Sequence, residues 1–285
     1  MGGSGRPPCP PDARSRPGTP GTALDHGHAL PASEHREAIL DQFTRQAVPF
    51  STAPGIQDEE ALRRVVEFAG AGPADTVLDV ACGGGLIVCA FARVVRHATG
   101  IDITPAMLER ARALAVERGL TNVSWRLGDV LPLPYPEASF SVVTSRYAFH
   151  HFLDPLAVLR EMARVCAPGG RVVVVDSAPA AGKDAAFNRL EKLRDPSHVR
   201  ALPLEELADL YRRADLGEPR TMSYRLDGEL EALIGRSFPR PEDVPEIRRI
   251  FAAAVDDDAP DVRARRDGDT IRYGYPVAIL AARRA

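Results

Sequence analysis

The chain has 285 residues, of which 45% are hydrophobic and 26% are charged, and its formal net charge is −3. These values are ordinary for a globular protein with a sizeable core, and they exclude the strongly basic composition of nucleic-acid-binding domains. No apolar run reaches the roughly 18 residues that a membrane span needs. We therefore expect a cytoplasmic protein with reduced thiols, no membrane span and no nucleic acid as partner.

The first 32 residues are rich in Pro, Gly and small polar residues and show no periodicity, which predicts a disordered tail. An α/β domain is expected over residues 33–285. Its core is expected at about 57–178, and a lid and C-terminal strands are expected at 179–285. No set of His, Cys and Asp residues has the spacing of a zinc site, so no metal is expected.

Helical and strand-like patterns alternate along the next part of the chain. This alternation predicts a doubly wound, Rossmann-like α/β fold around a parallel sheet. In chain order we expect helices at 33–50 and 56–70, a strand at 76–81, a helix at 86–95, a strand at 97–102, a helix at 104–119, strands at 122–129 and 140–146, a helix at 155–170 and a strand at 171–177.

Three acidic residues stand at or near the ends of three consecutive predicted strands. Asp79 lies in VLDVACGGG, directly before the glycines at 83–85, while Asp102 and Asp129 end the next two strands. The carboxyl ends of parallel strands form the ligand crevice of such folds. Consecutive glycines let a ligand approach the backbone closely, although a plain tight turn is the alternative. A carboxylate like that of Asp102 can accept hydrogen bonds from a ribose diol.

The glycine pattern also bears on which nucleotide is bound. Gly83 and Gly85 fit the first two positions of a dinucleotide motif, but Val88 stands where the third glycine belongs. No Gly-Lys-Ser/Thr follows, which excludes a phosphate loop. Acids at three strand ends favour a cationic adenosine ligand without phosphate.

Four motifs, in order, carry a resemblance to a known family: VLDVACGGG, GIDITPAML, LGDVLPLPYPEASFSVV and REMARVCAPGGRVVVVD. They resemble the class I S-adenosylmethionine-dependent methyltransferases, and within them the type-11 methyltransferase domain, akin to the ubiquinone/menaquinone-biosynthesis methyltransferases. The resemblance covers about residues 75–178. It implies a seven-stranded sheet whose last strand, at 270–284, is antiparallel and pairs with one near 219–226. It also implies N-terminal helices and a helical lid after the fifth strand.

The resemblance implies S-adenosylmethionine as cofactor. Asp79 and the backbone at 81–85 would hold its methionine portion, Asp102 its ribose and Asp129 the adenine edge. Ala81 replaces the family's first glycine, and we expect it at negative φ. The residues assigned to the cofactor are Asp79, Ala81, Cys82, Gly83, Gly85, Asp102, Ile103, Asp129, Val130 and Arg146.

The segment after the fourth strand, SRYAFHHFLDP, lacks the Asn/Asp-Pro-Pro-aromatic motif of amino-group methyltransferases. We expect His151, and His198 from the segment RDPSHVR, to face one acceptor pocket as catalytic bases. The alternative is that the histidines pack or cap and that RDPSHVR is a helix corner. The residues assigned to the substrate are Phe43, Phe50, Tyr147, His150 and Arg194.

These features predict transfer of a methyl group to an oxygen or carbon of a small-molecule acceptor. Arg194 would suit an anionic acceptor. One alternative is an S-adenosylmethionine-binding protein of the same fold without methyltransferase chemistry. An NAD-dependent oxidoreductase is a second alternative, which Val88 disfavours. The sequence does not specify an oligomeric state.

Overall fold

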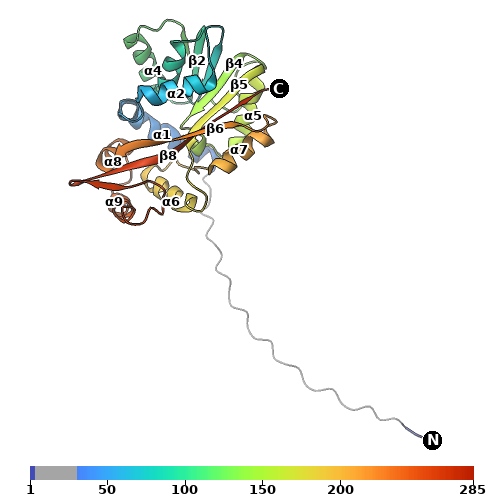
Figure 1. Cartoon of the computed structure of the whole chain (residues 1–285), viewed down its shortest axis with the longest axis vertical. Coiled ribbons are helices and arrows are strands. Elements are labelled where there is room, and N and C mark those ends of the chain that lie inside the picture. The colour runs from blue at the N-terminus through green and yellow to red at the C-terminus, as the bar shows by residue number, and fades with distance from the viewer. Residues whose placement is uncertain (4–30) are drawn as a thin grey trace. The chain divides into compact units, whose positions relative to one another are not determined.

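The computed structural model describes residues 1–3 and 31–285 (Figure 1). Contacts divide the chain into two units, residues 1–31 and 32–285, and the second unit holds all the helices and strands given below. Most of the predicted tail, with Cys9, lies outside the described residues. The predicted division at residue 33 stays a prediction.

A single mixed sheet organises the domain. Its order is β3-β2-β1-β4-β5-β8-β6, with β7 pairing with β8 alone. The strands β1 to β5 are parallel to one another, and β8 is antiparallel to both β5 and β6. The predicted Rossmann-like fold with an antiparallel C-terminal strand is confirmed, and β7 is an addition. The strands are β1 (Thr76–Val80), β2 (His97–Asp102), β3 (Val123–Leu127), β4 (Phe140–Arg146), β5 (Cys166–Ser177), β6 (Arg220–Glu229), β7 (Arg265–Asp267) and β8 (Thr270–Arg283).

Helices cover both faces of this sheet because its strands are apolar on both sides. Along β1, Val77 packs in one core cluster with α2, α3 and α4, while Leu78 packs in another with α5 and α7. The helices are α1 (Ala32–Ser51), α2 (Glu59–Ala69), α3 (Leu86–Ala92), α4 (Pro105–Glu117), α5 (Pro155–Val165), α6 (Asp184–Arg194), α7 (Leu204–Arg213), α8 (Leu230–Ser237) and α9 (Val244–Ala253), with a 3₁₀ turn, η1 (Phe149–His151).

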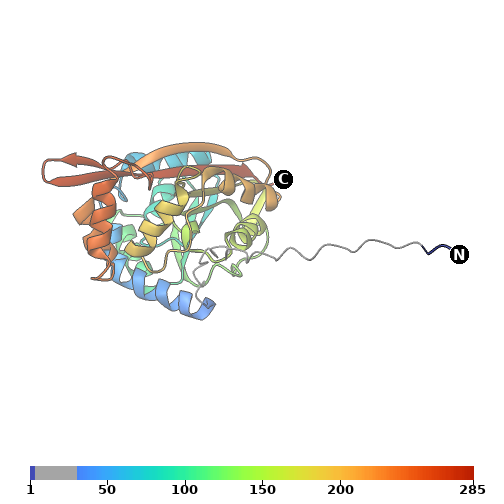
Figure 2. The same cartoon turned by 90° about the horizontal axis from the view of Figure 1, so that it is seen from below.

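Strands β6 and β8 run side by side at one end of the sheet (Figure 2). A third core cluster lies against these two strands. Residues of α6, α8 and α9 pack here around Tyr273 and Tyr275 of β8. Helices α8 and α9 are inserted between β6 and β8, a helical pair that the sequence analysis did not distinguish within residues 179–285.

The predicted helix at 155–170 is too long. Helix α5 ends at Val165, and β5 begins at Cys166, which pairs with Phe140 of β4. Pro168 explains the difference, because proline cannot continue a helix and disfavours helical backbone in the residue before it.

Two expectations from composition concern burial and membranes. Cys82, Cys89 and Cys166 are free and buried, as expected. Within residues 1–3 and 31–285, no helix combines the length and apolar character that crossing a membrane requires.

Gly85 permits the close contact between the glycine loop and β3. It has a φ of 78°, and a Cβ atom there would lie 2.5 Å from Cη2 of Trp125 and 2.8 Å from Cβ of Ala111. Gly119, after α4, has a similar φ of 65° but nothing within 4 Å of a built Cβ. Comparing alanine substitutions at Gly119 and Gly85 therefore separates the cost of backbone strain from the cost of steric overlap.

We expect Gly119→Ala to lower the free energy of unfolding by about 1–2 kcal/mol, the cost of a left-handed alanine. Gly85→Ala should lower it by about 1–3 kcal/mol more, because the methyl group must displace the Trp125 ring. Urea unfolding of both variants measures the difference. Equal losses in the two variants would contradict the role of Gly85 in packing.

Candidate functional site

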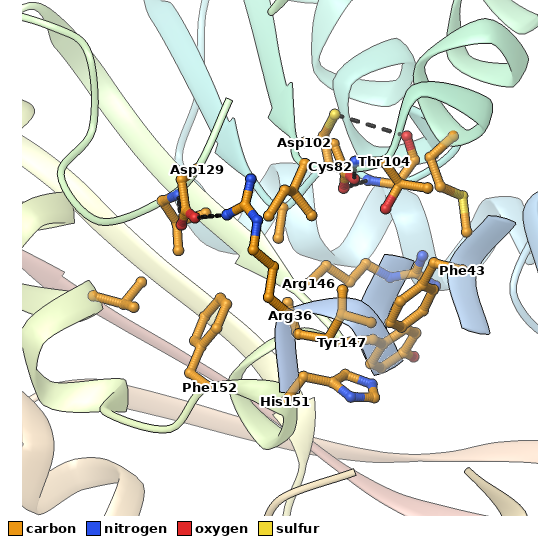
Figure 3. A pocket seen from close by; sticks show the side chains of 18 of the residues that line it. Arg36, Phe43, Cys82, Asp102, Thr104, Asp129, Arg146, Tyr147, His151 and Phe152 are labelled. Atoms are coloured by element: carbon orange, nitrogen blue, oxygen red, sulfur yellow. Dashed lines mark hydrogen bonds and ion pairs between the residues drawn. The ribbon is translucent and has the colours of Figure 1, made fainter. Parts of the chain in front are cut away.

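A cavity of about 540 Å³ lies where the loops after β1, β2, β3 and β4 meet helix α1 (Figure 3). This is the edge at which the carboxyl ends of the parallel strands meet, as the fold predicts. The cavity brings together these predicted residues: Phe43, Phe50, Asp79, Ala81, Cys82, Gly83, Asp102, Ile103, Asp129, Val130, Arg146, Tyr147 and His151.

The three consecutive glycines serve different purposes. Gly83 has a φ of 50° and lines the cavity with Gly84. A Cβ atom on Gly84 would lie 2.8 Å from Cβ of Ser51, so this glycine lets α1 approach the loop. Gly85 packs on Trp125 and does not line the cavity, although the sequence analysis assigned it to the cofactor. Only part of the glycine run is thus available to a ligand.

Ala81 differs from the expectation of a negative φ. Its φ is 55°, in the left-handed region, and Tyr147 at the end of β4 has a φ of 57°. A non-glycine residue in this region costs about 1–2 kcal/mol. Strained residues of this kind cluster at functional sites, where the surrounding structure holds them in place. Here they end two neighbouring strands, β1 and β4, and both line the cavity.

Asp102 holds the loops on both sides of it. Its Oδ2 atom accepts a hydrogen bond from the Gly83 N–H at 2.8 Å, and its Oδ1 atom accepts one from the Thr104 N–H at 2.8 Å. Burial raises the pKa of this carboxyl, although the two N–H groups favour its charged form. Because a carboxylate oxygen accepts more than one hydrogen bond, these contacts leave capacity for a ligand.

Asp79 and Arg146 both line the cavity, and neither forms an ion pair with a described residue. Asp79 is 1% exposed, and its Oδ1 atom has no hydrogen-bond partner among the described residues. Burial raises the pKa of Asp79 well above its usual range. Arg146 lies over the Tyr147 ring at 4.2 Å and donates to the Ile56 carbonyl at 3.1 Å, while its buried Nε has no partner in the described part of the chain.

Helix α1 closes the cavity through polar contacts. Arg36 reaches across to form an ion pair with Asp129 (Figure 3). His35 donates from Nε2 to the carbonyl of His151 at 2.7 Å. Gln42 donates to the carbonyl of Ser237 at 2.5 Å. The sequence analysis assigned Asp129 to a ligand but did not foresee that α1 would bind it.

The two histidines of η1 have different environments. His150 Nδ1 lies 2.5 Å from Oδ1 of Asp176, and burial, which disfavours its charge, is outweighed by this carboxylate, so the pKa of His150 is raised. His151 donates from Nδ1 to the Ser197 carbonyl at 3.1 Å. Burial and the neighbouring His150 lower the pKa of His151 to about 4. The two rings are 4.2 Å apart, so a proton on one disfavours a proton on the other.

A second, smaller cavity of about 60 Å³ adjoins the first and shares Phe43, Phe50, Tyr147 and His151 with it. Apart from Gln46 of α1, its other polar lining residues come from η1, β5, α8, β8 and from α6 with the residue that follows it. They include His150, Ser177, Glu191, Arg194, Asp195, Arg236, Ser237, Tyr273 and Tyr275.

Two predicted substrate-side residues are placed differently from expectation. Arg194 lines the second cavity, but its Nε and Nη2 donate to Glu191 at 2.9 and 2.6 Å and its Nη1 donates to the Ser237 hydroxyl at 3.1 Å. His198 lines neither cavity, and its Nε2 lies 2.7 Å from Asn188. The reason is that the next two N–H groups, of Val199 and Arg200, bind the carbonyl of His150 and hold this segment behind η1.

Sequence reasoning missed four residues that the structure brings to the site: His35, Arg36, Asp176 and Arg236. Asp176 stands near the end of β5, so the strand-end pattern that identified Asp79, Asp102 and Asp129 extends to it. No sequence signal distinguishes Arg236 from the many other arginines of the chain.

Residues 78–174 match a family model described as a methyltransferase domain. The uncharacterized methyltransferase YcgJ of Bacillus subtilis is 34% identical over 196 residues, which are 68% of this chain and 78% of the relative. The crystal structure of YcgJ superposes with a TM-score of 0.71 at 29% identity, covering 79% of this chain and 99% of that chain.

Two further relatives are named for their reactions and match shorter segments. The probable tocopherol O-methyltransferase of Oryza sativa is 31% identical over 153 residues, 53% of this chain and 38% of the relative. The ubiquinone/menaquinone biosynthesis C-methyltransferase UbiE of Bdellovibrio bacteriovorus is 37% identical over 116 residues, 40% of this chain and 49% of the relative.

The lowered pKa of His151 makes stability depend on pH. The unfolded chain binds a proton on this ring near pH 6.5, whereas the folded protein does so only at about pH 4. The free energy of unfolding therefore falls as the pH drops through this window. His198 acts in the same direction, because burial lowers its pKa too. His150 acts in the opposite direction, since its pKa is raised.

We expect His151→Gln to remove one proton from this dependence, which reduces the slope by about 1.4 kcal/mol per pH unit within the window. Urea unfolding of both proteins at pH 7, 6 and 5 measures the slope. A variant whose stability declines as steeply as that of the unsubstituted protein would contradict the assignment of a neutral His151.

Proposed function

The chain belongs to the class I S-adenosylmethionine-dependent methyltransferases, and we propose that it transfers a methyl group from S-adenosylmethionine to an oxygen or carbon of a small-molecule acceptor. The observation that carries the proposal is the pair of side chains, Asp79 and Arg146, that line the cavity at the strand ends, because the buried Oδ1 of one and Nε of the other have no partner among the described residues. The relatives named as O- and C-methyltransferases support both kinds of acceptor atom.

The residues present fit this cofactor. The buried, unpartnered Oδ1 of Asp79 suits the ammonium group of the methionine portion, and Arg146 suits its carboxylate. Asp102 has lone pairs left for the ribose hydroxyls, and Ile103 and Val130 line the cavity beside Asp129 for the adenine. Gly83 lets the backbone approach the ligand. When bound, the cofactor supplies a methyl group on a positively charged sulfur.

The chain's own contribution to catalysis is to orient and deprotonate the acceptor. We assign the general base to His150 rather than to His151 or His198. Asp176 binds His150 at Nδ1, which fixes the ring and stabilises its charged form, and Nε2 has no hydrogen-bond partner among the described residues. His150 also lines the second cavity, which supports a role for Nε2 in taking a proton from an acceptor hydroxyl or acidic carbon.

His151 has a different role in this proposal. Its Nδ1 carries a proton because the Ser197 carbonyl only accepts, so Nε2 presents a lone pair. Since its pKa is lowered to about 4, the ring stays neutral at pH 7 and acts as a hydrogen-bond acceptor for the substrate. His198, bound to Asn188 away from both cavities, supports η1 from behind.

The cofactor is tested by ligand-induced stabilisation. We expect S-adenosylhomocysteine to raise the melting temperature and NAD not to, since only a ligand of the native state stabilises it. Asp102→Ala should weaken S-adenosylhomocysteine binding by about 1.5–3 kcal/mol in calorimetry, because a charged acceptor is lost. Glu117→Ala, on the exposed side of α4, is the control and should bind normally. Stabilisation by NAD alone would overturn the proposal.

The base is tested by turnover. His150→Ala should lower S-adenosylhomocysteine production by about 10²–10⁴-fold with a panel of phenols, quinols and hydroxy acids, while cofactor affinity is kept. Asp176→Asn should lower turnover in the same direction and change the pH profile, since the ring loses its orienting charge. A loss confined to His151→Gln, with His150→Ala fully active, would refute the assignment.

A further inference from the structure

The second cavity contains a cation that has no anionic partner within the part of the chain that the structure describes. Arg36 and Arg194, which line the two cavities, both form ion pairs. Arg146 and Arg236 do not, and one of them lines each cavity. Arg146 is accounted for by the proposed cofactor, whereas Arg236 has no assigned role.

Arg236 is held at the end of α8. Its side chain donates from Nη2 to the hydroxyl of Tyr273 at 2.8 Å, and the residue is partly buried. Tyr273 itself is 1% exposed, so this contact holds the guanidinium against a buried residue near the beginning of β8. Partial burial of a guanidinium without a counter-charge is unfavourable, which makes an anion a favourable addition here.

The carboxylates around this cavity are already engaged. Glu191 accepts two hydrogen bonds from Arg194 and a third from the Tyr275 hydroxyl at 2.6 Å. Asp195 accepts from the Ser197 N–H at 2.9 Å and from its hydroxyl at 2.6 Å. Asp176, behind the cavity, binds His150. Arg194 offsets the charge of Glu191, and the other contacts occupy oxygen atoms of Asp195 and Asp176, so none of the three acids forms an ion pair with Arg236.

The dimensions and walls of the cavity limit what enters it. A water molecule needs roughly 10–15 Å³ of cavity volume. The second cavity, with about 60 Å³, therefore admits a small group such as a carboxylate but not a second ring system. Phe43, Phe50 and Tyr147 form the wall shared with the large cavity and suit an apolar or aromatic body. His150 lines the second cavity together with these aromatic residues.

We propose that Arg236 binds a carboxylate of the acceptor, so that the acceptor is a small hydroxy acid with an aromatic or apolar body. This inference rests on the proposed function and names the substrate class of that site. The carboxylate occupies the second cavity, and the ring lies along the shared aromatic wall. The reacting hydroxyl then lies near the boundary of the two cavities, where the ring centroid of His150 is 4.2 Å from that of His151, which lines both. Arg236 thereby replaces Arg194 as the residue that recognises the anion.

The test uses the full chain saturated with S-adenosylhomocysteine and two probes, 4-hydroxybenzoate and its methyl ester. We expect calorimetry to give a dissociation constant at least 10-fold lower for the acid than for the ester. Arg236→Gln should abolish this preference, because the amide keeps a donor for Tyr273 but loses the charge. Arg236→Lys should retain part of it. Arg240→Gln, at an exposed position beyond α8, is the matched control and should leave the preference unchanged.

The outcomes separate the two proposals. Absence of S-adenosylhomocysteine binding overturns the proposed function. Normal S-adenosylhomocysteine binding with equal affinity for acid and ester, with no binding of the acid, or with the preference intact in Arg236→Gln overturns this inference alone. Circular dichroism and the retained affinity for S-adenosylhomocysteine establish that each variant is folded.

Discussion

The carboxylate of Asp102 joins the two loops on which the site depends. It accepts one backbone N–H from the loop after β1, at Gly83, and another from Thr104, directly before α4. The loop after β1 carries Ala81 in a strained conformation and lies beside the buried Asp79. A single charged side chain at the end of β2 therefore fixes the backbone against which a ligand would bind. The other side chains that line the cavity surround a backbone that the Asp102 carboxylate holds in place.

Helix α1 contributes to the site in another way, because its buried face is largely polar. His35, Gln42, Gln46 and Ser51 are all buried, and the first three bind backbone carbonyls of η1 and α8. Hydrogen bonds of this kind are worth only about 1 kcal/mol each, since water can replace them. Helix α1 is thus held beside the cavity by contacts that are specific in geometry but individually weak in energy.

The sheet and the cofactor side of the site were predictable because they depend on local patterns. Parallel strands end at one edge, so the positions of Asp79, Asp102 and Asp129 in the sequence were enough to bring them together. The acceptor side depends on contacts between distant segments. Arg194 is an exception, because Glu191 lies three residues before it on α6, a spacing in the sequence that already favours their ion pair. Arg236 was not foreseen, because its hydrogen-bond partner lies on β8 and the nearby acid that is already paired lies on α6.

The position of β8 in the sheet has a consequence for how the chain folds. This strand follows β6 in the sequence but lies between β5 and β6, so β6 has no place in the sheet until β8 has paired with β5. Pairing across such sequence separations closes large loops and is slow. On a ribosome, the parallel half with the cofactor residues is complete long before Tyr273 and Tyr275 arrive. During synthesis of each chain, the residues proposed to bind the cofactor would then be in place before the residues proposed to bind the acceptor.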